Sequence, residues 1–115
     1  MARITGWRRA AERRGLYVAR AVAELRSWPV LAVSDTRRGV AFAVRGTEIL
    51  RLTGGDEVQV RLTASAIDRL EPHLLDCDQV QACRDRAWVA VQVDAAPDLD
   101  LLLALTSVAI KEHVA

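Results

Sequence analysis

Apolar and polar residues alternate most regularly between residues 39 and 62. From Glu57 to Leu62 every second residue is apolar, which is the pattern of a strand with one buried face. Two short turn sequences, Arg45-Gly46 and Thr53-Gly54-Gly55-Asp56, divide this region into three segments. We expect a further strand at Val30–Ser34, so the first half of the chain is predicted to contain a meander of four antiparallel strands.

Helical periodicity marks three other segments. The first runs from about Gly6 to Ser27 and is ended by Trp28-Pro29. A second helix is expected after Thr63, a plausible N-cap, with Pro72 predicting a kink or a short separate turn. A strand over 87–93 and a helix opening at Pro97-Asp98 complete the pattern.

This order of elements predicts an α+β domain: N-terminal helix, four-strand antiparallel meander, helix, fifth strand and C-terminal helix, with the helices on one sheet face. At 115 residues the chain has the length of one domain, so we expect a single unit over 1–115. Within it, residues 1–28 form the basic N-terminal helix and residues 30–115 form the core.

The C-terminal helix is expected to be apolar around most of its circumference. Its one mild or polar stripe consists of Asp100, Ala104, Ser107 and Lys111. A helix of this kind is buried on more than one side. Either the N-terminal helix or a second subunit covers the second side, and we therefore expect a homodimer formed through the C-terminal helix.

Charge is distributed unevenly along the chain, although the net charge is only +1. Residues 1–27 contain seven arginines and two glutamates, whereas residues 66–115 contain four basic and nine acidic residues. Arginines on a helix can contact phosphates or an acidic protein surface. The candidate residues for binding nucleic acid or a protein partner are Arg8, Arg9, Arg13, Arg14 and Arg20.

Catalytic, metal and cofactor motifs are weak. His73, Cys77 and Cys83 are close in sequence, but their spacing matches no standard zinc site. No serine lies in a G-x-S-x-G turn, and the 53–56 turn lacks the lysine of a phosphate-binding loop. We expect no catalytic residue, bound metal or cofactor. The longest apolar run is far below the ~20 residues that cross a bilayer, so we expect a cytoplasmic protein with no membrane partner.

One candidate small-molecule pocket lies around Trp88, whose expected neighbours on the sheet face are small. A large ring beside small residues either receives a packed helix, here through Trp7 or Trp28, or floors a shallow pocket. Arg45 and Arg61 are the nearest polar anchors. The candidate pocket residues are Trp88, Ala41, Ala43, Ala90, Arg45 and Arg61.

Several segments resemble a small bacterial family known as the luciferase domain, over roughly residues 30–112. They are Gly39-Val40-Ala41-Phe42, Arg45-Gly46-Thr47-Glu48-Ile49, Val60-Arg61-Leu62-Thr63, Ala87-Trp88-Val89 and Asp98 through Ile110. The layout is more distantly similar to the MmcQ/YjbR-like α+β domains, some of which are described as DNA-binding. Many luciferase-domain members have histidines just after the glutamate of the second strand, but Glu48 to Thr53 contains none.

The resemblance implies the fold and supplies no reaction. Two functions are therefore expected from the sequence. The first is a non-catalytic binding module that meets nucleic acid or protein through its arginine-rich helix. The alternative is a luciferase-domain-type enzyme or small-molecule binder that uses the Trp88 face of the sheet.

Overall fold

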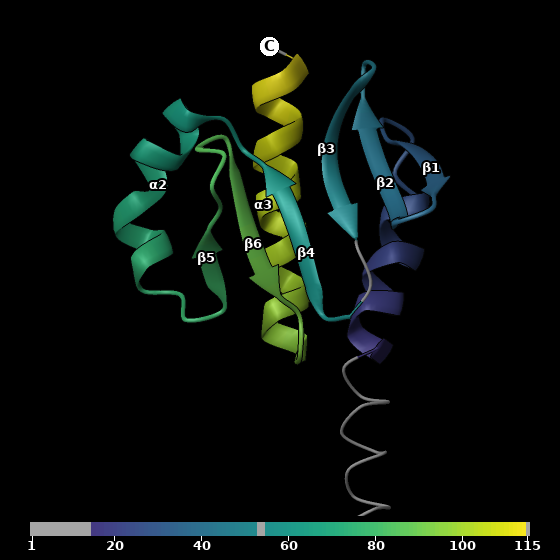
Figure 1. Cartoon of the computed structure of the whole chain (residues 1–115), viewed down its shortest axis with the longest axis horizontal. Helices are drawn as coiled ribbons and strands as arrows, with labels where there is room; N and C mark the ends of the chain where they lie inside the picture. The colour runs from purple at the N-terminus through teal and green to yellow at the C-terminus, as the bar shows by residue number, and fades with distance from the viewer. Residues whose placement is uncertain (1–14, 53–54, 115) are drawn as a thin grey trace, which may run out of the picture.

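The structure is a computed structural model, and it describes residues 15–52 and 55–114 (Figure 1). In this part of the chain one antiparallel sheet has the strand order β1-β2-β3-β4-β6-β5. The helical residues 15–26 precede the sheet. The remaining elements are β1 (Ala32–Thr36), β2 (Gly39–Val44), β3 (Thr47–Leu52), β4 (Glu57–Arg61), α2 (Ala64–Leu75), β5 (Val80–Ala82), β6 (Trp88–Gln92) and α3 (Ala96–Val114).

The predicted α+β class and the four-strand meander β1–β4 are confirmed, with two differences. The first strand lies two residues later than the predicted Val30–Ser34. The second half of the sheet contains a three-residue strand, β5, in addition to the predicted fifth strand. β5 forms a hairpin with β6, and β6 pairs with β4, so β6 is an interior strand.

The hydrophobic core lies on one face of the sheet. Phe42, Leu50, Val60 and Val91 are fully buried there, and α3 contacts β2, β3, β4 and β6. Both α3 and the helix at residues 15–26 lie behind the sheet in Figure 1. Helix α2 flanks β5, and its Ala66 reaches the same core. The helices within the described residues therefore leave the other sheet face uncovered; we call it the open face.

A β-bulge interrupts the pairing of β2 with β3. Phe42 pairs with Leu50, but the next residue, Ala43, pairs with Glu48, which leaves Ile49 as an extra residue on β3. Ile49 and Leu50 are consequently both buried. The bulge has a second result: Glu48 and Arg51, three residues apart, both lie on the open face, opposite Ala43 and Ala41 respectively.

The helix ends are stabilised by the side chains that the sequence indicates. The Thr63 hydroxyl accepts a hydrogen bond from the amide of Ala66, which confirms Thr63 as the N-cap of α2. Helix α2 continues through Pro72 to Leu75, so the predicted separate turn does not form. Pro72 lies in the last turn, where its missing N–H removes one bond close to the end of the helix.

The start of helix α3 and its outward side can be compared with the prediction. Asp98 accepts hydrogen bonds from the amides of Asp94 and Ala95, before the helix and at its start. Three members of the predicted mild or polar stripe, Asp100, Ala104 and Lys111, are exposed, and the fourth, Ser107, is half-buried. No helix in the described ranges is long and apolar enough to cross a membrane.

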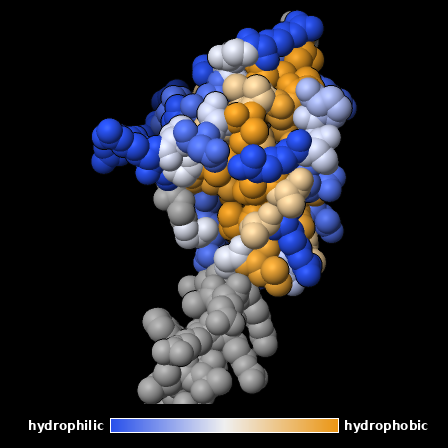
Figure 2. Space-filling model, turned by 90° about the vertical axis from the view of Figure 1, so that its right-hand side faces the viewer, coloured by the Kyte–Doolittle hydropathy of each residue, from blue (hydrophilic) through white to orange (hydrophobic). Residues whose placement is uncertain are grey.

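Strand β1 is one of the two edge strands of the sheet, and all five of its residues are exposed. Figure 2 shows the flank of the molecule that carries this edge, where apolar and charged residues are interspersed. Val33 lies in β1 and is 39% exposed, and Val30, two residues before the strand, is 45% exposed.

Candidate functional site

The open face is built from the residues that alternate with the core positions of each strand. Because strands pair in register, one row of side chains crosses the whole sheet. It consists of Ser34, Ala41, Arg51, Gln59, Ala90 and Gln81, in that order from β1 to β5. This row brings together residues that are up to 56 positions apart in the chain, and it has a charged residue at its centre.

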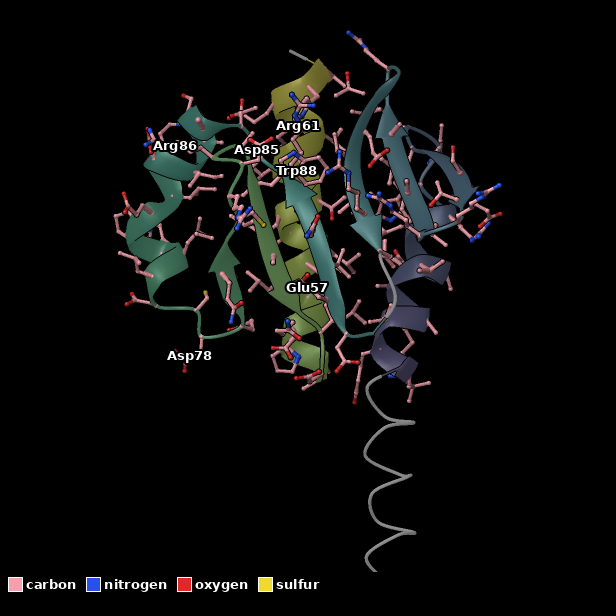
Figure 3. The ribbon with its side chains drawn as sticks, in the orientation of Figure 1. Glu57, Arg61, Asp78, Asp85, Arg86 and Trp88 are labelled. Carbon is pink, nitrogen blue, oxygen red and sulfur yellow. The ribbon has the colours of Figure 1, made fainter. Side chains whose placement is uncertain are left out.

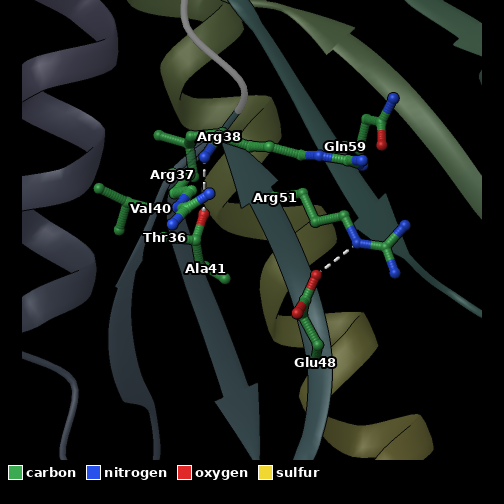
Figure 4. A pocket seen from close by; sticks show the side chains of 9 residues that line it. Thr36, Arg37, Arg38, Val40, Ala41, Glu48, Arg51 and Gln59 are labelled. Atoms are coloured by element: carbon green, nitrogen blue, oxygen red, sulfur yellow. Dashed lines mark hydrogen bonds and ion pairs between the residues drawn. The ribbon is translucent and has the colours of Figure 1, made fainter.

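A cavity of about 620 Å³ lies at the β1–β2 end of this face. Its polar wall is formed by residues of the β1–β2 turn, β3 and β4 (Figure 4). The charged side chains of the wall are three arginines and one glutamate. The lining residues are Thr36, Arg37, Arg38, Val40, Ala41, Glu48, Arg51, Leu52 and Gln59.

The turn that carries Arg37 and Arg38 is fixed by Thr36. The Thr36 hydroxyl donates to the carbonyl of Gly39 at 2.8 Å and accepts from the amide of Arg38 at 3.2 Å. Such side-chain bonds to the backbone hold a tight turn in one conformation. Arg38 extends from this turn across the cavity toward Gln59 (Figure 4).

Arg51 forms the boundary between the cavity and Trp88. Its Nε donates to Glu48 Oε1 in an ion pair, and its guanidinium carbon lies 4.2 Å from the centroid of the Trp88 ring. That distance is within the range of a cation–π contact. Trp88 is only 4% exposed. It therefore lies beneath Arg51 and does not form the floor of the cavity.

Arg61 is the second arginine beside this ring. Arg61 pairs directly with Trp88 across β4 and β6, and both belong to the open face, at the end of β4 and the start of β6 (Figure 3). Its Nε is buried and has no hydrogen-bond partner among the described residues. A buried donor without a partner is uncommon in folded proteins and marks a place where a ligand or a water molecule completes the bonding.

The candidate pocket residues from the sequence share this face only in part. Ala41 lines the cavity, Ala43 lies opposite Glu48, and Ala90 lies opposite Gln59. Arg45 is not beside them: at the β2–β3 turn it donates to the carbonyl of Val114 at 3.2 Å. The alternative, in which Trp88 receives the N-terminal helix, does not describe Trp28, which packs against the core on the other face; Trp7 lies outside the described residues.

Most of the candidate residues for binding nucleic acid or a protein partner are not among the described residues. Arg8, Arg9, Arg13 and Arg14 lie outside the described residues. Arg20 is exposed on the helix at 15–26, with its guanidinium carbon 5.4 Å from the centroid of the Tyr17 ring. A partner-binding role for these arginines stays a prediction.

Thiols and histidines do not assemble into a further site. In residues 15–52 and 55–114 no three His, Cys, Asp or Glu side chains converge as metal ligands would. Cys83 is half-buried after β5, and burial, with the charges of Glu57 and Asp85, raises the pKa of its thiol. His113 Nδ1 bonds to the carbonyl of Ala109 at 2.7 Å near the end of α3.

Sequence reasoning missed the residues that dominate the cavity. Arg37, Arg38 and Glu48 appear in the sequence as ordinary turn and strand residues, and Arg51 carries no distinguishing motif. One signal was present: Glu48 and Arg51 flank Ile49-Leu50, a pair of apolar residues that breaks strict alternation and points to a bulge. The stacking of Arg51 on Trp88 has no sequence signal.

Comparisons with known proteins show which family this chain belongs to. No match is found among curated proteins or among solved structures. Residues 46–109 match the Luciferase domain family. They extend from the β2–β3 turn into α3 and include Glu48, Arg51, Arg61 and Trp88. Because the match covers more than half of the chain, we conclude that this protein belongs to the Luciferase domain family.

Proposed function

We propose that this protein binds a small molecule in the cavity on the open face of its sheet. The observation that supports this most directly is a cavity of about 620 Å³ on the face that the described helices leave uncovered. Ligand sites commonly have volumes of ~300–1,000 Å³ and a few converging polar groups. The proposal assigns binding and no reaction step, and its place within a luciferase-domain fold agrees with the second function expected from the sequence.

Charge favours an anion as the ligand. Three arginines and one glutamate line the cavity, so its wall has an excess of positive charge. Fixed arginines raise the local concentration of anionic ligands and pair with them by directed hydrogen bonds. The Thr36 bonds that hold the turn reduce the ordering cost of binding, because Arg37 and Arg38 start from a fixed backbone.

The test is a ¹⁵N NMR screen of the full chain with small anions, cations and neutral molecules. We expect an anion to shift the signals of Arg38, Arg51 and Gln59, and Arg38→Glu to abolish the shifts without unfolding the protein, because Arg38 is exposed. Arg20→Glu is the matched control, since it makes the same charge change on the helix at 15–26. If no molecule of any charge shifts these signals, the proposal is wrong.

A second experiment separates this function from the nucleic-acid binding expected for the N-terminal helix. A titration of labelled duplex and single-stranded DNA at about 50 and 200 mM salt tests phosphate contacts, whose affinity falls steeply over that range. DNA binding that is lost on reversing Arg9 and Arg13 and kept in Arg38→Glu would favour the nucleic-acid function.

The homodimer is a further part of the proposal. Ala104 is exposed on the outward side of α3, and a small residue at this place lets a second helix approach closely. Ala104→Arg would then lower the dimerisation affinity measured by sedimentation equilibrium. Val33→Arg, on the exposed β1 edge, is the control that separates this interface from strand pairing. If the wild-type protein is a monomer at high concentration, neither the α3 interface nor strand pairing through β1 forms a dimer.

A further inference from the structure

We propose that Glu48 occupies the place of the ligand's own oxyanion on Arg51, and that it acts as a built-in competitor for a ligand bearing a carboxylate or a phosphate. This inference rests on the proposed function, because it concerns the same cavity. It adds the chemical class of the ligand and a residue that limits its affinity.

The geometry of Arg51 is the first support. The flat guanidinium is held from two directions, by the Trp88 ring at 4.2 Å and by Glu48 at its Nε. Its two terminal nitrogens point away from Glu48 (Figure 4). A ring contact on one side and an ion pair at Nε restrict the positions that the guanidinium can adopt before a ligand arrives. Arg51 is therefore preorganised to bind an oxyanion.

The position of Glu48 is the second support. Both Glu48 and Arg51 line the cavity, and Glu48 holds the Nε of Arg51. A ligand oxyanion that pairs with Arg51 through Nε and one terminal nitrogen therefore has to displace the Glu48 carboxylate. Glu48 faces the open side because of the bulge at Ile49, and Ala43, the small residue opposite, leaves space around its side chain. A carboxylate on a cavity-lining arginine shows which chemistry that arginine accepts.

The Glu48–Arg51 ion pair is weak enough for a ligand to replace Glu48. The side chains of Glu48 and Arg51 are 41% and 49% exposed. An ion pair with this exposure contributes only ~0.2–1 kcal/mol. A ligand that bonds to Arg51 and also approaches Arg37 and Arg38 has more partners than the single Glu48 carboxylate. When Glu48 moves aside, the three cavity arginines are left to the ligand.

The cavity does not favour a cationic or a neutral ligand. A cation would have to bind Glu48 with Arg37, Arg38 and Arg51 around it, and like charges at close range oppose this. A neutral ligand would leave the cavity charges as they are and would gain nothing from the loss of Glu48. The effect of removing the Glu48 charge therefore distinguishes the three classes.

The experiment is an NMR titration of the full ¹⁵N-labelled chain with two probes that share a ring and differ in the anion, benzoate and phenyl phosphate. Benzyl alcohol is the neutral control. The signals followed are the Arg side-chain Nε–H groups and the indole N–H of Trp88, assigned by substitution. In Glu48→Gln we expect the ion pair with Arg51 to be lost. We also expect whichever of the two anions binds wild type more tightly to bind about twofold to fivefold more tightly still, because a surface ion pair contributes free energy of that size.

Two variants complete the design. Arg51→Gln removes the donor and is expected to lower affinity at least tenfold. Glu57→Gln is the matched control, because Glu57 is a carboxylate on the open face of β4 that does not line the cavity. It is expected to leave the affinity within twofold of wild type, which excludes a general effect of net charge.

The results separate this inference from the proposed function. If Glu48→Gln binds anions equally or more weakly, or if Glu57→Gln tightens binding as much, Glu48 is not a competitor and the inference is wrong. If only benzyl alcohol shifts the cavity signals, the small-molecule function stands and the oxyanion class is wrong. If no probe and no broader screen shifts them, the proposed function itself fails.

Discussion

The guanidinium carbon of Arg51 lies 4.2 Å from the centroid of the Trp88 ring, although the two residues belong to strands separated by β4. Arg51 on β3 therefore reaches across a whole strand to cover an aromatic residue of β6. Trp88 would otherwise be a large apolar ring on the face that the described helices do not cover. The contact joins the two halves of the sheet on that face and separates the ring from the cavity.

We expect Arg51→Ala to expose Trp88. The tryptophan emission should shift to longer wavelength, acrylamide quenching should increase, and the free energy of unfolding should fall by about 0.5–1 kcal/mol, the value of an exposed cation–π pair. Arg37→Ala, also an arginine of the cavity wall, should leave emission and quenching unchanged. Identical spectra for wild type and Arg51→Ala would show that the stacking is absent in solution.

The cap of α2 gives a second prediction. Thr63→Ala removes the hydroxyl that accepts from the amide of Ala66, so the free energy of unfolding in urea should fall by about 1 kcal/mol. Thr63→Ser keeps the hydroxyl and should retain most of this stability. The backbone φ of Thr63 is 94°, which is more strained for β-branched Thr than for Ala or Ser, so the comparison of Ala with Ser isolates the hydroxyl. Equal destabilisation by Ala and Ser would contradict the capping role.

Adjacent leucines on α3 test the orientation of this helix. Leu102 is fully buried, whereas Leu101 is only partly buried against the core. Leu102→Ala creates a cavity and should lower the free energy of unfolding by about 2–5 kcal/mol. Leu101→Ala leaves a gap that solvent can partly fill and should lower it by clearly less. The reverse order in urea denaturation would mean that α3 is rotated about its axis.

Cys83 gives a prediction about pH. Burial, then the charges of Glu57 and Asp85, raise the pKa of this thiol above its ordinary value of 9.0. As pH rises above about 9, the unfolded chain releases the proton before the folded chain does, so the free energy of unfolding falls. Urea denaturation at pH 8 and pH 10 should show a larger loss for wild type than for Cys83→Ser.

Glu57→Gln serves as the second arm of that experiment. It removes one of the two charges that disfavour the thiolate, so the pKa of Cys83 should move back toward the ordinary value. The rate at which a thiol reagent modifies Cys83 should then rise at a given pH, because the thiolate is the reacting form. A rate that does not change would mean that Glu57 does not contribute and would leave burial and Asp85 as the causes of the shift.

Much of the fold could be predicted from local patterns. Alternation of apolar residues identified β2, β3, β4 and β6, and it placed Trp88 and Ala90 on the face opposite to Val89 and Val91. Helical periodicity identified α2 and α3, with Thr63 as a cap and the outward stripe of α3. These features depend on interactions between residues a few positions apart, so a short window of sequence contains the information.

The candidate site was predicted only in part. Trp88, Ala41, Ala43 and Ala90 were assigned to one face, and they share it, because a period of two decides the face of each strand. Arg45 was assigned to the same group, but the turn directs it to the end of α3. Arg37, Arg38 and Glu48 were missed, because nothing in their own segments indicates what lies beside them.

The sequence by itself determined the class of the domain, the faces of its strands and the ends of its helices, since these follow from backbone geometry and local burial. Only the tertiary structure decided that β6 lies between β4 and β5, that Ile49 bulges and that Arg51 covers Trp88. Strand order and register depend on hydrogen bonds between segments far apart in the chain, and one extra residue in a strand moves its neighbours to the other face. The Glu48–Arg51 pair exists on the open face for that reason.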